Sequence, residues 1–128
     1  MQAFTHYFLH LFFPLGIAWI FFRSDWKRAY LIFLATMLVD LDHLWADPIF
    51  EPQRCSIQFH YLHTYYAMIV YAILLVFRKP FNIIGLGLLM HMATDLIDCL
   101  WTYSDCPTCL EGAPAIDLVE WIAKSGLF

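Results

Sequence analysis

The chain has 128 residues, of which 62% are hydrophobic, 19% are aromatic and only 14% are charged. A soluble domain has roughly a quarter of its residues charged, so this composition predicts an integral membrane protein. The net charge of −4 and the lack of a basic block argue against a nucleic-acid-binding protein. The first residues also lack the basic segment and small-residue cleavage site of a signal peptide, so we expect the first apolar segment to be a retained span.

Four apolar runs are long enough to cross a bilayer, which takes about 17–25 helical residues. They cover approximately residues 4–22, 29–46, 60–77 and 81–101. The runs are continuously apolar rather than alternating, which favours helices over a barrel. The sequence therefore predicts an all-α integral membrane protein, with a four-transmembrane-helix bundle in residues 1–101.

Basic residues in the loops predict the orientation of these helices. Residues 23–28 contain three basic residues and residues 78–80 contain two, whereas residues 47–59 contain only Arg54. Cytoplasmic loops carry an excess of lysine and arginine, so we expect the first two loops inside and both termini outside. This orientation fits a bacterial inner-membrane protein with extracytoplasmic termini.

Residues 102–128 form an extracytoplasmic tail in this interpretation. A polar loop with a Cys-Pro-Thr-Cys motif at residues 106–109 comes first, and Pro114 then opens a short helix that ends near Lys124. Apolar residues recur at helical spacing within residues 116–123. We therefore expect an amphipathic helix that lies on the membrane surface or caps the bundle.

His91, Asp95 and Asp98 lie inside the fourth apolar run, where ionisable side chains are costly. Their spacing of four and three residues places all three on one face of a helix. At ~1.5 Å per residue from Pro80, His91 lies about 16 Å along the helix, near the membrane midplane. A charge buried in lipid costs several kcal/mol unless it is paired or binds a cation, so we expect partners on other helices.

The other three runs supply such partners, all in the outer half of the bilayer. They are His6 and His10 in the first run, Asp40, Asp42 and His43 in the second, and His60 and His63 in the third. Antiparallel helices bring such residues together in a bundle core. Imidazole and carboxylate ligands suit zinc, iron or manganese, and ten such groups exceed the needs of one ion. We therefore expect two divalent metal ions, zinc before iron or manganese, whose charge of +4 balances four intramembrane carboxylates.

Each residue of this cluster has an expected role. The expected metal ligands are His6, Asp40, Asp42, His43, His63, His91 and Asp95. Asp42 is a bridging or additional ligand in this assignment. We expect Asp98, His60 and His10 to assist catalysis by orienting ligands or transferring protons. Taken singly, these residues also fit plainer roles, such as an interfacial histidine, a helix-end turn or an interhelical pair.

Four short motifs follow one another along the chain. They are Thr5-His6, Asp40-Leu41-Asp42-His43, His60 with His63-Thr64, and His91 with Asp95. In order and helical placement they resemble the small bacterial membrane-bound metal-dependent hydrolases of the YdjM type, over about residues 5–101. The spacing between His60 and His63 departs from that family, whose middle motif is wider. The resemblance implies a metal-dependent hydrolase but leaves the substrate open.

These observations predict a membrane-embedded hydrolase that uses metal-activated water to cut a lipid or lipid-linked ester or phosphoester at the outer leaflet. Its partner would be a membrane lipid substrate, and the sequence leaves open whether the chain forms a homo-oligomer. A non-catalytic metal-binding protein, a b-type haem protein and a metal transporter are alternatives. Four carboxylates argue against haem, and the cytoplasmic half lacks polar residues for an ion path.

Four cysteines lie on the predicted outer side, where an oxidising compartment favours disulfides. They are Cys55, Cys99, Cys106 and Cys109. Either two structural disulfides or one disulfide and a free pair fits the sequence. The pair Cys106 and Cys109 also resembles the exchangeable cysteines of quinone-coupled enzymes that make disulfides. A thiol–disulfide redox protein is therefore the main alternative function.

Overall fold

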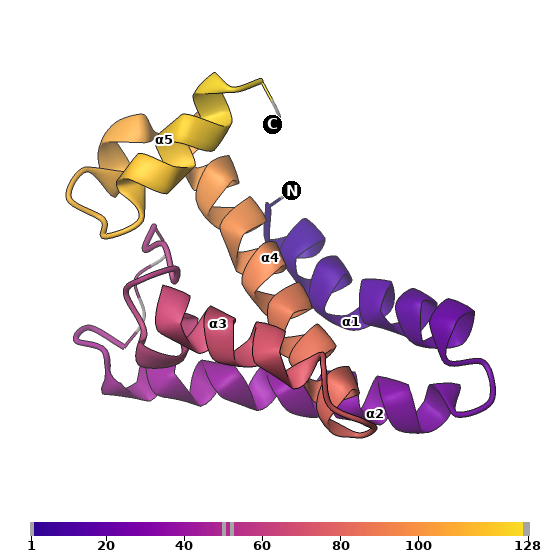
Figure 1. The fold of residues 1–128 in the computed structure, drawn as a ribbon. Coiled ribbons are helices and arrows are strands. Elements are labelled where there is room, and N and C mark those ends of the chain that lie inside the picture. The colour runs from indigo at the N-terminus through magenta and orange to yellow at the C-terminus, as the bar shows by residue number, and fades with distance from the viewer. Residues whose placement is uncertain (1, 50, 52, 127–128) are drawn as a thin grey trace.

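The structure is a computed structural model that describes residues 2–49, 51 and 53–126. Regular secondary structure in these residues is entirely helical, which confirms the predicted all-α class (Figure 1). The α-helices are α1 (Gln2–Phe21), α2 (Trp26–Thr36), α3 (Tyr65–Leu74), α4 (Phe81–Asp105) and α5 (Ile116–Lys124). Three 3-10 helices connect them, η1 (Met37–Trp45), η2 (Tyr61–His63) and η3 (Pro107–Leu110).

α4 is the central helix, and it contacts α1, α2 and α3 (Figure 1). Two of its glycines allow this close packing. A Cβ atom at Gly85 would lie 2.6 Å from the Tyr71 carbonyl oxygen of α3. A Cβ atom at Gly87 would lie 2.9 Å from the side chains of Phe33 and Thr36 on α2. Small residues thus bring the backbones of α2 and α3 close to α4, as in packed membrane helices.

Among the described residues, two helices, rather than the four that we predicted, are long and apolar enough to cross a membrane. They are α1, over Phe4–Phe21, and α4, over Phe81–Asp105. The second predicted span divides into the 11-residue α2 and the 3-10 helix η1. The third is shortened because the Thr64 side chain accepts a hydrogen bond from Ala67 N and starts α3 at Tyr65. Continuous apolar sequence therefore did not correspond to one long α-helix in either run.

Large apolar side chains cover the surface of α1. Phe4 is 74% exposed, Phe12 61% and Phe21 70%. Monomeric soluble proteins rarely expose an extended apolar surface of this kind. Together with the two long apolar helices, this surface supports association with a membrane.

The chain beyond α4 packs back onto it. Val119 of α5 is fully buried in the same hydrophobic cluster as Met92 and Leu100 of α4. A buried disulfide joins Cys55 to Cys99, and a second, partly exposed one joins Cys106 to Cys109 around η3. The cysteines therefore form two disulfides, and α5 is an amphipathic helix that packs against the bundle.

Candidate metal centre

Local helix geometry sets the directions of the polar side chains on η1 and α4. Residues three apart eclipse one another in a 3-10 helix, so Asp40 and His43 share one ridge of η1, with 3.6 Å between Asp40 Oδ1 and His43 Nδ1. On α4, His91 and Asp95 lie one turn apart, with 3.3 Å between His91 Nε2 and Asp95 Oδ2. Because α4 contacts η1, the two pairs meet, and His91 Nε2 lies 3.1 Å from Asp40 Oδ1.

A central group forms where η2 adds a histidine to these residues. It comprises Asp40, His63, His91 and Asp95, whose ligand atoms all lie within 4.8 Å of one another. His63 Nε2 lies 3.4 Å from Asp40 Oδ1 and 3.1 Å from Asp95 Oδ2. His63, His91 and Asp95 are buried, whereas the Asp40 side chain is 37% exposed and forms the open edge. This group could hold a metal ion.

A second group lies on the α1 side of Asp95. It comprises His6, His10 and Asp95, again with ligand atoms within 4.8 Å of one another. His10 Nε2 lies 3.5 Å from Asp95 Oδ1, and the His10 ring lies 4.4 Å from that of His6 and 4.5 Å from that of His91. Asp95 therefore presents Oδ2 to the central group and Oδ1 to the second group. A carboxylate in this position could bridge two metal ions.

A third group comprises Asp42, His43 and His60 on η1 and the loop before η2. The His43 and His60 rings stack with their centroids 3.7 Å apart, and His43 Nδ1 lies 3.1 Å from Asp42 Oδ1. The other Asp42 oxygen accepts a hydrogen bond from Leu62 N at 2.8 Å and lies 3.1 Å from His63 Nδ1. Asp42 thereby holds the His63 ring with its Nε2 directed at the central group, as carboxylates do behind metal-ligating histidines.

Six buried polar atoms of the cluster make no hydrogen bond of good geometry among the described residues, although two of them, His63 Nε2 and Asp95 Oδ2, lie 3.1 Å apart. They are His6 Nδ1, His10 Nε2, His60 Nε2, His63 Nε2, His91 Nδ1 and Asp95 Oδ2. Unpaired buried polar atoms are rare in folded proteins and usually indicate a missing partner. Burial and the neighbouring His43 lower the pKa of the His60 imidazole to about 4, so this ring is neutral near pH 7 and keeps a lone pair. The residues present thus fit a divalent metal ion.

Asp98 lies at the exposed edge of the second group. Its Oδ1 atom is 3.9 Å from His6 Nδ1 and accepts a hydrogen bond of 2.9 Å from Gln2 Nε2. The Asp98 side chain is 36% exposed and belongs to none of the three groups. The structure thus gathers all ten residues that the sequence indicated, with Asp98 at the solvent-accessible margin.

Residues 1–102 match the model of a family of unknown function, DUF6122. The chain belongs to this family. The DUF6122 match includes all ten residues of the cluster and ends before Cys106. Neither a curated protein nor a solved structure matches the chain. The resemblance to YdjM-type hydrolases is not tested by the DUF6122 match and stays a prediction.

Sequence reasoning missed three polar residues around the cluster of this DUF6122 member. The Ser56 hydroxyl lies 3.2 Å from His43 Nε2, and Gln2 binds Asp98 as described above. The Tyr71 hydroxyl donates to Leu62 O at 2.9 Å and so supports η2 beside His63. Gln2 lies one helical turn before His6, which is a signal that the sequence contains. Ser56 lies in a loop, where no periodicity could indicate it.

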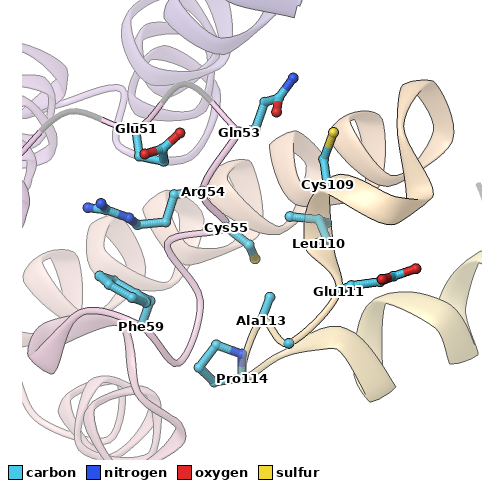
Figure 2. A pocket seen from close by; sticks show the side chains of 11 residues that line it. Glu51, Gln53, Arg54, Cys55, Phe59, Cys109, Leu110, Glu111, Ala113 and Pro114 are labelled. Carbon is cyan, nitrogen blue, oxygen red and sulfur yellow. The ribbon is translucent and has the colours of Figure 1, made fainter. Parts of the chain in front are cut away.

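A separate pocket of about 360 Å³ lies beside the cluster, between the loop after η1 and the connection from η3 to α5 (Figure 2). Arg54, Glu51, Glu111 and Cys109 are among the residues that line it, and none of the ten cluster residues does. Phe59 in its lining contacts the third group, because the centroid of its ring lies 5.0 Å from that of His60. The pocket is therefore adjacent to the candidate metal centre and distinct from it.

Proposed function

We propose that this protein is a membrane-embedded metal-dependent hydrolase that cuts a lipid or lipid-linked ester or phosphoester at the outer leaflet. The position of Asp95 carries the proposal. Its two oxygens face two different histidine groups, at 3.1 Å from His63 and 3.5 Å from His10. Divalent ions in such paired sites activate water and polarise the oxygen of the bond to be cleaved.

The three groups suggest how the ligands divide between two ions. The central group would hold one ion and the second group the other, with Asp95 shared between them. Asp42, His43 and His60 would support the central group from behind, because Asp42 and His43 contact its members. Zinc is the first choice for this mixture of imidazole and carboxylate, with iron or manganese as alternatives.

The exposed edges of the cluster suggest where substrate reaches it. Asp40 and His43 form one edge, with side chains 37% and 31% exposed, and His6 and Asp98 form another, at 30% and 36%. Asp98 lies 3.9 Å from His6 without belonging to the second group, and Gln2 holds its Oδ1. Its carboxylate could therefore accept a proton from the attacking water or return one to the leaving group. These features favour Asp98 as a general acid–base.

Metal content tests the proposal directly. We expect protein purified without chelator to hold close to two divalent ions per chain. Asp95→Ala should lose both, because one carboxylate serves both groups, whereas Asp117→Ala on the exposed face of α5 should keep them. The wild type, loaded with metal, should release head groups from a panel of membrane lipids. Wild-type protein without metal, or Asp95→Ala with normal metal content, would contradict the assignment.

The disulfide between Cys106 and Cys109 supports a second candidate function, thiol–disulfide exchange. Both cysteines are partly exposed, and Cys109 lines the pocket of Figure 2. A thiol substrate in this pocket would lie beside an exchangeable disulfide. This candidate ranks below the hydrolase, because it leaves the buried histidine and aspartate cluster without a role.

A further inference from the structure

An apolar groove of about 470 Å³ lies between α2, α3 and α4. Its lining includes Ile32, Leu38, Val39, Ile84 and Leu88. Two of the lining residues, Thr36 and Tyr71, carry a hydroxyl group, and each hydroxyl is hydrogen-bonded within the protein. The Thr36 hydroxyl donates to Phe33 O at 2.6 Å, and the Tyr71 hydroxyl donates to Leu62 O. The groove thus offers hydrocarbon surface of a volume typical for ligand sites, roughly 300–1,000 Å³.

Several residues of the groove lining are neighbours of the central group along the chain. Val39 and Leu62 line the groove and directly precede Asp40 and His63 in the chain, and Leu88 lies one turn before His91. From that end the groove follows α2 back towards Ile32, a distance of ~10 Å at 1.5 Å per residue. Chain neighbours of the central group therefore line one end of the groove, and the lining from there to Ile32 is apolar apart from the hydrogen-bonded hydroxyl of Thr36.

We propose that this groove holds a hydrocarbon chain of the substrate lipid and places the lipid's polar group at the central metal group. The inference rests on the proposed hydrolase function. In the predicted orientation, the central metal group lies on the outer side and the apolar groove extends from it towards the membrane midplane. The polar group and the hydrocarbon chains of an outer-leaflet lipid are arranged in the same order. A chain that fills the groove also fixes the bond to be cleaved beside Asp40, the open edge of the central group.

The effect of the groove is orientation rather than attraction. A lipid chain is already in apolar surroundings within the membrane, so its transfer into the groove gains little from the hydrophobic effect. Blocking the groove should therefore slow cleavage of long-chain substrates. A short, water-soluble ester needs no chain site, so its cleavage should be unaffected.

Ala35→Trp is the blocking variant, because Ala35 is a small, exposed residue of the groove lining. Leu31→Trp is the matched control on the same helix, since Leu31 is 64% exposed and lies outside the lining. The first probe is a phosphatidylcholine with a photoactivatable diazirine in its acyl chain, reconstituted with the protein in vesicles. Labelled peptides are mapped by mass spectrometry.

We expect labelling concentrated in residues 32–39 and 84–88, at least fivefold above the exposed face of α3 at Ile69 and Val70. Ala35→Trp should remove this excess and Leu31→Trp should keep it. Equal labelling of the groove and the face at Ile69 and Val70 would show surface lipid only and overturn the inference. Groove labelling that persists unchanged in Ala35→Trp would overturn it as well.

The second probe is a pair of esters, p-nitrophenyl palmitate and p-nitrophenyl acetate, with zinc-loaded protein. We expect Ala35→Trp to slow palmitate cleavage at least tenfold and acetate cleavage less than twofold. Equal slowing of both esters would overturn the inference. If the wild type cuts neither ester nor any lipid while the groove labelling holds, the hydrolase proposal fails and the groove stands as a lipid-binding site.

Discussion

Asp42→Asn tests how the third group supports the central one. Asp42 is 2% exposed, and its two oxygens face Leu62 N, His63 Nδ1 and His43 Nδ1 at 2.8, 3.1 and 3.1 Å. An asparagine has the same shape but replaces one acceptor oxygen by an NH₂ donor. If the NH₂ group replaces Oδ2, it faces the Leu62 N–H, which is also a donor, and that contact becomes repulsive. If it replaces Oδ1, it faces His43 Nδ1, which accepts a hydrogen bond only when the His43 proton is on Nε2, and a neutral amide oxygen then replaces the carboxylate behind His63.

The size of the effect follows from these contacts. Loss of a carboxylate behind a metal-ligating histidine typically weakens metal binding by 10–100-fold. We expect that range for the central ion, because a neutral amide behind His63 Nδ1 holds the ring less firmly, with Nε2 towards Asp40 and Asp95, than the carboxylate does. A buried donor without an acceptor costs about 1–3 kcal/mol, so metal-free Asp42→Asn should unfold more easily by that amount.

Chelator competition measures the metal affinity, and chemical denaturation of the metal-free protein in detergent measures the stability. Asp117→Asn, on the exposed face of α5, is the control and should change neither. A zinc affinity within twofold of wild type would refute the orienting role of Asp42. Complete loss of one ion, as expected for removal of a direct ligand, would instead make Asp42 a ligand, as the sequence first indicated.

Three further predictions concern catalysis, the cysteines and the orientation. Asp98→Asn should keep the metal but lose turnover by about 10²–10⁴-fold, measured as head-group release with metal content on the same samples; full activity would remove Asp98 from the mechanism. Replacing Cys106 and Cys109 together with serine should leave hydrolysis largely intact and cost only about 2 kcal/mol of stability, because the loop that they close is short. Quinone-dependent thiol oxidation that disappears in this double variant would favour the redox function instead. A cysteine placed at Ser24 should resist a membrane-impermeant reagent in intact cells, whereas reduced Cys106 should react; the opposite pattern would invert the predicted orientation.

Local sequence was enough to indicate the helical class and the residues of the cluster. Spacing of three and four residues fixes a common helix face for His91, Asp95 and Asp98 whatever the rest of the fold does. The cost of ionisable groups in apolar runs then requires that such residues find partners, which is why all ten side chains could be named before their contacts were known.

The same local reasoning failed where an apolar run changes its backbone conformation. Hydropathy does not distinguish an α-helix from a 3-10 helix. The apolar run from 29 to 46 therefore gave no sign that the backbone changes from an α-helix to a 3-10 helix at Met37. The start of α3 was in principle readable, because Thr64 is a residue type that caps helices. Its hydroxyl, rather than the apolar character of residues 60–64, decides where the helix begins.

Only the tertiary structure decided which atoms face one another. The 3-10 repeat of three residues puts Asp42 on a different ridge from Asp40 and His43, so Asp42 contacts His63 Nδ1 and lies outside the central group. The two-sided position of Asp95 likewise depends on α1 and η2 packing on opposite sides of one α4 residue. The sequence also could not decide how the cysteines pair, because pairing depends on which of them lie close together in space. Cys55 and Cys99 form a disulfide although they are 44 residues apart in the chain. Spacing along a chain determines the face of a helix, but contacts between helices depend on how they cross and on side-chain rotamers.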